Sequence, residues 1–152
     1  MIYKLFEFLN KIHPAETLYA HCDIPCGIYT SEPALTAAKT VVKMVEKIEE
    51  LAPPNLAARD MSEMKSKANS IVRFIMVKEE HAQICKEQLL ILWTEYFEPE
   101  HLRDFPDLHD TFWKATKLCS KNKQEVNMEA AQELLSAVEG IASMFQKAAA
   151  QQ

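Results

Sequence analysis

A histidine and two cysteines lie close together near the amino end of the chain, in residues 21–29, which read His-Cys-Asp-Ile-Pro-Cys-Gly-Ile-Tyr. Thiolates are soft ligands that favour copper(I), zinc or nickel over magnesium or calcium. No second ligand pair follows Cys22 and Cys26 at the spacing of a zinc finger, so an ordinary structural zinc site is not expected. From this spacing alone, a metal site, a labile disulfide and two unremarkable thiols all remain open.

Backbone nitrogen could complete a metal site in this segment. If the chain were cut before His21, a free amine would lie next to Cys22. That amine, the amide nitrogen of Cys22 and the sulfurs of Cys22 and Cys26 could form a planar set of two nitrogens and two sulfurs, which is typical of nickel(II) and copper(II). Pro25 would bend the chain back toward the metal, and Gly27 permits backbone conformations that other residues avoid.

Composition predicts a helical protein. Only 2 of the 152 residues are glycine, against an average of about 7%, and a sandwich or barrel needs glycines at its tight turns. The net charge of −5 argues against a sequence-independent nucleic-acid binder, which needs a basic face. No run of about 18 apolar residues is present, so no membrane span is expected.

Residues 1–20 are expected to be a removable pro-segment. Lys4 and Glu7 interrupt the apolar start of the chain, which makes it a poor export signal. The segment ends in Ala20, a small residue of the kind that many processing sites prefer.

Apolar residues at spacings of three and four predict four amphipathic helices, over residues 33–51, 60–97, 106–121 and 127–149. The apolar faces of the last three are expected to include Ile71, Phe74 and Ile75 in the second helix, Leu108, Phe112, Ala115 and Cys119 in the third, and Leu134, Val138, Ile141 and Phe145 in the fourth. The short connections between them predict antiparallel neighbours, so we expect an all-α, up-and-down four-helix bundle with an N-terminal metal-binding hook. The second helix would be about 57 Å long at 1.5 Å per residue, which predicts a break near Ser66 to Asn69. Asp60 and Glu63 predict a capping box at its start. Cys85 and Cys119 are expected to be buried thiols.

The segment 21–29 is similar, at every fixed position of His-Cys-Asp-x-Pro-Cys-Gly-x-Tyr, to the nickel hook of nickel superoxide dismutases. A second block, residues 92–101 followed by 105–109, also resembles that family, and a weaker match covers Arg73 and Lys78-Glu79. Together these stretches span most of the chain from residue 21 to about residue 121. The fourth helix matches only in its pattern.

The resemblance implies a cytoplasmic superoxide dismutase that is made as a precursor, matured by a protease that removes residues 1–20, and assembled as a homohexamer. One nickel ion per subunit would be held by His21, Cys22 and Cys26, and would alternate between Ni(II) and Ni(III) while superoxide becomes dioxygen and hydrogen peroxide. Tyr29 and Tyr96 correspond to two tyrosines at the substrate entrance. Asp23 matches a residue that orders the hook through hydrogen bonds.

The sequence also departs from the family pattern. His81 stands where better-known members keep an arginine behind the axial imidazole, Ala37-Ala38 lie near a glutamate position, and residues 53–66 contain an insertion. The main alternative is a non-catalytic helical metal carrier that binds nickel or copper through Cys22 and Cys26. A helical interaction module with incidental cysteines is a second alternative.

Overall fold

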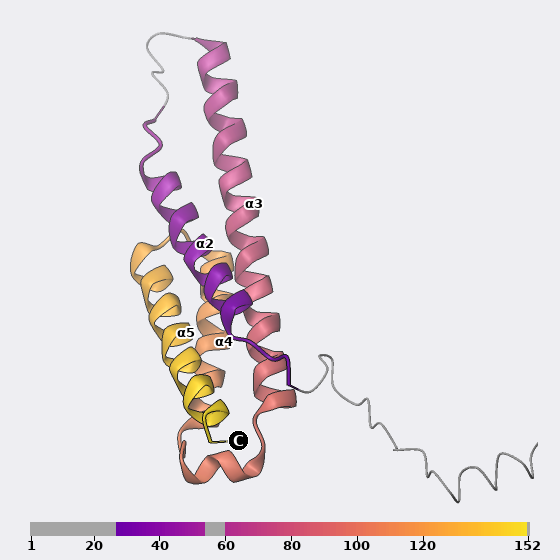
Figure 1. The fold of residues 1–152 in the computed structure, drawn as a ribbon. Helices are drawn as coiled ribbons and strands as arrows, with labels where there is room; N and C mark the ends of the chain where they lie inside the picture. Colours follow the sequence, from indigo (N-terminus) through magenta and orange to yellow (C-terminus); the bar gives the residue numbers. More distant parts are fainter. Residues whose placement is uncertain (1–26, 54–59, 152) are drawn as a thin grey trace, which may run out of the picture.

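The computed structural model describes residues 27–53 and 60–151, and every regular element in these ranges is helical. The elements are α2 (Glu32–Glu49), α3 (Met61–Ile91), the π-helical turn η2 (Leu92–Tyr96), the 3-10 helix η3 (Pro99–Arg103), α4 (Leu108–Gln124) and α5 (Met128–Ala149). Figure 1 shows α2, α3, α4 and α5 side by side as a bundle, which confirms the predicted fold class. None of the described helices is both long enough and apolar enough to cross a lipid bilayer. The predicted hook lies almost entirely outside the described residues.

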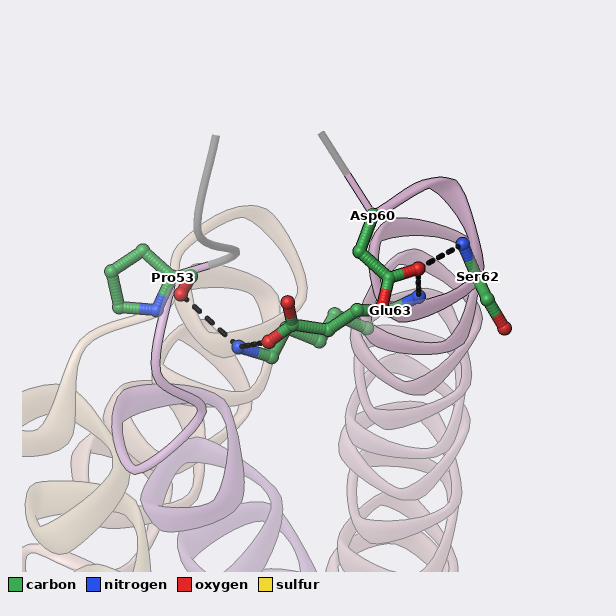
Figure 2. A network of polar contacts seen from close by, with 5 residues as sticks. Pro53, Asp60, Ser62 and Glu63 are labelled. Atoms are coloured by element: carbon green, nitrogen blue, oxygen red, sulfur yellow. Dashed lines mark hydrogen bonds and ion pairs between the residues drawn. The ribbon is translucent and has the colours of Figure 1, made fainter. Parts of the chain in front are cut away.

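The start of α3 is fixed by side-chain hydrogen bonds, as Figure 2 shows. The Asp60 carboxylate accepts from the backbone N–H groups of Ser62 at 2.8 Å and Glu63 at 3.2 Å. The return bond of a capping box does not form, because the Glu63 carboxylate pairs with Lys67 at 2.8 Å. Lys67 also donates to the carbonyl of Pro53 at 3.1 Å, which ties the exit of α2 to the first turns of α3.

Helix α3 is continuous over 31 residues, so the predicted break near Ser66 to Asn69 is wrong. At 1.5 Å per residue α3 is about 46 Å long, and its first half projects beyond α4 and α5 instead of bending to stay within the bundle (Figure 1). The predicted apolar face is also wrong at Ile71, which is 36% exposed. We call this first half, together with the end of α2, the α2–α3 arm.

The core lies where all four helices overlap. In α3 the buried residues are Lys78, Ala82, Cys85 and Leu89, which recur at spacings of four and three and form one narrow stripe. The predicted faces of the later helices are confirmed, since Phe112 of α4 is 0% exposed and the α5 stripe is buried at Leu134, Val138 and Ile141. Buried alanines at 34, 37 and 38 keep the bundle-facing side of α2 small, so this helix can approach its neighbours closely.

A buried lysine secures the connection between α4 and α5. Lys78 is 1% exposed, and its ammonium donates to the carbonyls of Asn122, of Lys123 at 3.3 Å and of Glu125 at 2.8 Å. These carbonyls lie at the carboxyl end of α4, where a cation is favoured by the helix dipole. Burial lowers the pKa of Lys78, and the three carbonyl partners compensate for the loss of water around the charge. Asn122 adds a side-chain bond to the carbonyl of Ala130 at 2.8 Å.

Candidate functional site

The described part of the candidate site is a pair of tyrosines at the end of the bundle opposite the α2–α3 arm. The rings of Tyr29 and Tyr96 lie 5.6 Å apart between centroids, at an interplanar angle of 59°. Tyr29 belongs to the segment that leads into α2, and Tyr96 is the last residue of η2. The two sequence blocks that carry the family resemblance therefore meet in space, as expected if both serve one site.

The π-helical turn explains how Tyr96 reaches this position. Leu92 is 2% exposed and Phe97 is 8% exposed, so both contribute to the core. In a regular α-helix these residues would lie about 140° apart around the axis, since 3.6 residues make a turn. The wider turn, closed by a hydrogen bond of 3.2 Å from the Phe97 N–H to the Leu92 carbonyl, lets both face inward. Single π-helical turns within helices are frequent at functional sites.

Aromatic rings from three elements hold Tyr96 in place. Its ring lies 4.5 Å from Phe145 of α5, 5.1 Å from Phe97 and 5.9 Å from His101 of η3, between centroids. His101 is fixed in turn, because its Nδ1 accepts a hydrogen bond of 2.9 Å from the Glu98 N–H. The sequence analysis gave no indication of the contact between His101 and Tyr96. The contact between Phe145 and Tyr96 had one sequence signal, because Phe145 is the last residue of the apolar face predicted for α5.

The hydroxyl of Tyr96 is buried and has no hydrogen-bond partner among the described residues. Burial raises the pKa of the Tyr96 phenol, so the group stays protonated and can donate one hydrogen bond at neutral pH. A buried polar atom without a partner is uncommon in a folded protein, and it often marks a place where a ligand or a water binds. Tyr96 is therefore a candidate donor to a small anion.

Gly27 marks the point where the described chain meets the predicted metal-binding segment. Its φ of +88° lies in the left-handed region that side chains rarely adopt, so the expectation of an unusual backbone conformation at this glycine is confirmed. Gly27 directly follows the predicted ligand Cys26 in the sequence. The predicted ligands His21, Cys22 and Cys26, together with Asp23, lie outside the described residues.

The chemistry of this donor set fits nickel. Among residues 27–53 and 60–151, no three His, Cys, Asp or Glu side chains converge in a group that could hold a metal ion. The two remaining cysteines, Cys85 and Cys119, are buried and free, as predicted. The soft thiolates and backbone nitrogens predicted as ligands in residues 21–26 are donors that suit a planar nickel(II) site.

His81 does not join the tyrosine pair within one chain. It lies in α3, fifteen residues before Tyr96, or about 22 Å along the helix axis at 1.5 Å per residue. Its Nδ1 lies 2.9 Å from the carbonyl of Val77 in the preceding turn. Ala37 and Ala38, near the family's glutamate position, are buried in the core. A role of His81 behind the axial imidazole therefore stays a prediction.

Comparison with known proteins agrees with this arrangement. A sequence model described as nickel-containing superoxide dismutase matches residues 16–149. The nickel superoxide dismutase of Streptomyces seoulensis is 30% identical over 132 residues, which cover 87% of this chain and 90% of that protein. The enzyme of Streptomyces coelicolor is 29% identical over the same number of residues, with the same two shares.

Solved structures of nickel superoxide dismutase have the same fold. The native enzyme aligns with a TM-score of 0.70 and 26% identity, covering 84% of this chain and 98% of that one. A structure of the oxidised state aligns with a TM-score of 0.67 and 30% identity, covering 84% and 97%. Because the family model matches residues 16–149, which is most of the chain, the chain belongs to the nickel-containing superoxide dismutase family.

Proposed function

We propose that this protein is the precursor of a nickel-dependent superoxide dismutase that converts superoxide to dioxygen and hydrogen peroxide. The observation that carries the proposal is the contact between Tyr29 and Tyr96. It brings Tyr29, the last residue of the hook motif, against Tyr96 of the second family block, whose hydroxyl is buried. A helical interaction module would have no need of this convergence.

We assign the metal to the segment 21–26. The amine and imidazole of His21, the amide nitrogen and thiolate of Cys22 and the thiolate of Cys26 would hold nickel, and Asp23 would order the segment through hydrogen bonds. When bound, nickel would supply one-electron chemistry between Ni(II) and Ni(III), which lets one superoxide be oxidised and the next reduced. Thiolates and an anionic amide are electron-rich donors and favour the higher oxidation state.

The tyrosines would act on the substrate and its product. The protonated phenol of Tyr96 can donate a hydrogen bond to superoxide or peroxide, because burial keeps its pKa above the usual value. The rings of Tyr29, Tyr96 and Phe145 pack closely, so they would admit a diatomic anion and exclude larger reductants. Neither hydroxyl needs to lose its proton for this role.

Maturation and assembly complete the proposal. Removal of residues 1–20 by a protease would create the His21 amine that binds the metal, in the cytoplasm. A homohexamer is the proposed assembly, and the exposed apolar side chains of Val72, Met76 and Trp113, each more than half exposed, are of the kind that neighbouring subunits cover.

The test compares the full chain with a form that begins at His21, each loaded with nickel under the same conditions. We expect dismutase activity and a planar nickel spectrum only from the form that begins at His21, whose start is verified by intact mass. Full activity in the uncut, nickel-loaded chain would refute the role of the His21 amine. Tight nickel binding without activity in both forms would point to a metal carrier instead.

A further inference from the structure

Two thiols outside the nickel hook meet at the interface between α3 and α4. Cys85 and Cys119 are both 0% exposed and belong to the same core cluster, and each thiol shifts the pKa of the other. The proposed dismutase chemistry does not use either residue. Sequence analysis predicted that each would be buried, but it gave no indication that they would be neighbours.

Two polar bridges fix the register of the two helices beside this pair. Lys123 of α4 donates to the Gln83 side chain of α3 at 2.7 Å, and Lys86 of α3 donates to the Ser120 hydroxyl of α4 at 3.2 Å. Lys86 directly follows Cys85 and Ser120 directly follows Cys119, so the second bridge joins the immediate neighbours of the two cysteines. The thiols are therefore held opposite one another by the fold and do not meet by an occasional fluctuation.

The surroundings make the two thiols unequal. The hydrogen bond from Cys85 lowers the pKa of Cys119, against the opposing effect of burial, and the ammonium groups of Lys86 and Lys123 lower it further. The same hydrogen bond, together with burial, raises the pKa of Cys85. Cys119 is thus favoured as the thiolate, which is the nucleophilic form, while Cys85 keeps its proton.

We propose that Cys85 and Cys119 form a peroxide-oxidisable dithiol that closes to a disulfide between α3 and α4. The Cys119 thiolate attacks one oxygen of hydrogen peroxide, the O–O bond breaks, and the departing hydroxide takes a proton to become water. The Cys85 sulfur then attacks the resulting Cys119 sulfenic acid, the S–O bond breaks, and the hydroxyl leaves as water with the Cys85 proton. In total, two thiols and one peroxide give one disulfide and two waters.

The oxidant is the product of the proposed dismutation, so the pair would sense or consume peroxide that the enzyme itself releases. The thiol chemistry does not depend on nickel, however, because it needs only peroxide. Added peroxide therefore tests the dithiol separately from the proposed function.

The experiment treats the folded full chain with equimolar to fivefold hydrogen peroxide, blocks the remaining thiols with an alkylating agent, and maps the disulfides by peptide mass spectrometry. We expect a Cys85–Cys119 linked peptide in more than half of the molecules, which is distinguished by mass from any Cys22–Cys26 product. The linked form should also melt several degrees higher than the reduced form, since the bond restricts the unfolded chain.

Single variants test the order of the steps. In Cys85→Ser, where a hydroxyl replaces the thiol as hydrogen-bond donor, peroxide should leave Cys119 as a sulfenic acid that a dimedone-type reagent traps, because the second thiol is missing. In Cys119→Ala, Cys85 should remain an alkylatable thiol at the same peroxide dose. The proposal is overturned if both cysteines of the folded wild type stay fully alkylatable after treatment, or if the linkage appears only after unfolding. Trapping at Cys85 in place of Cys119 would overturn the assigned order.

Discussion

Changing Tyr96 to phenylalanine removes one hydroxyl and keeps the ring that contacts Phe145, Phe97 and His101. The hydroxyl is buried without a described partner, and a buried polar group left unsatisfied costs about 1–3 kcal/mol. Because the Tyr96 side chain as a whole is only partly buried, we expect the lower end of this range. The metal-free variant should therefore be more stable than the wild type by about 1 kcal/mol, or about 2–4 °C in melting temperature for a chain of this size.

The pH dependence gives the same prediction a second readout. Burial raises the pKa of Tyr96 in the folded protein, so above about pH 10, the usual tyrosine value, the unfolded chain releases this proton more readily than the folded one. The wild type then loses stability as the pH rises through this window, and Tyr96→Phe lacks that loss. The difference in free energy of unfolding between the two proteins should widen above about pH 10.

The assay is urea or thermal unfolding of metal-free protein at one fixed protein concentration, because assembly also contributes to stability. Phe145→Leu serves as the control, since it removes the 4.5 Å ring contact while the hydroxyl stays, and it should lower the melting temperature. Dismutase activity of nickel-loaded Tyr96→Phe should fall several-fold in spite of the higher stability. A variant that melts lower than the wild type would show that the hydroxyl has a partner and that the reasoning is wrong.

Three further changes address other parts of the molecule. Tyr29→Phe should keep nickel bound and change inhibition by azide or peroxide several-fold, as expected from the loss of one hydrogen bond of roughly 1 kcal/mol; unchanged inhibition would remove Tyr29 from the substrate entrance. Cys22→Ser and Cys26→Ser should each abolish activity and the planar nickel spectrum, because oxygen does not replace sulfur on this metal. Lys78→Met should destabilise the protein by about 2–4 kcal/mol in urea unfolding, because it leaves buried carbonyls without a donor. The control, Lys65→Met on the exposed side of α3, should change stability by less than about 0.5 kcal/mol.

Apolar periodicity predicted the buried faces of the helices correctly wherever a neighbouring helix covers the apolar face. Phe112 and Cys119 of α4 and Leu134 of α5 were expected in the core and are there, because a periodic apolar face and a covering neighbour occur together. In α3 the pattern predicted that Ile71 faces the core, yet Ile71 lies on the arm, beyond α4 and α5, and is 36% exposed. The true buried stripe instead includes a charged residue, Lys78, whose partners are backbone carbonyls that no periodicity can reveal.

Contacts between helices were harder to predict than the helices themselves. The approach of Cys85 to Cys119 depends on the register between α3 and α4, which the Lys123–Gln83 and Lys86–Ser120 bridges fix. A spacing within one helix contains no information about that register. The tyrosine pair was predicted only through the family resemblance. The contact of Tyr96 with Phe145 could not be predicted, because it depends on where the end of α5 lies relative to η2.

The projecting arm also has a consequence for how this chain can change in length. The first turns of α3, which form the tip of the arm, lie at the opposite end of the bundle from η3 (Figure 1). Lys78 and the stripe that follows it set the register of α3 in the bundle, so residues gained or lost before that point shift the tip and leave the core alignment intact. Such a site tolerates inserted sequence better than any loop next to the core. The arm is accordingly the natural place to graft a tag or a small domain onto this enzyme.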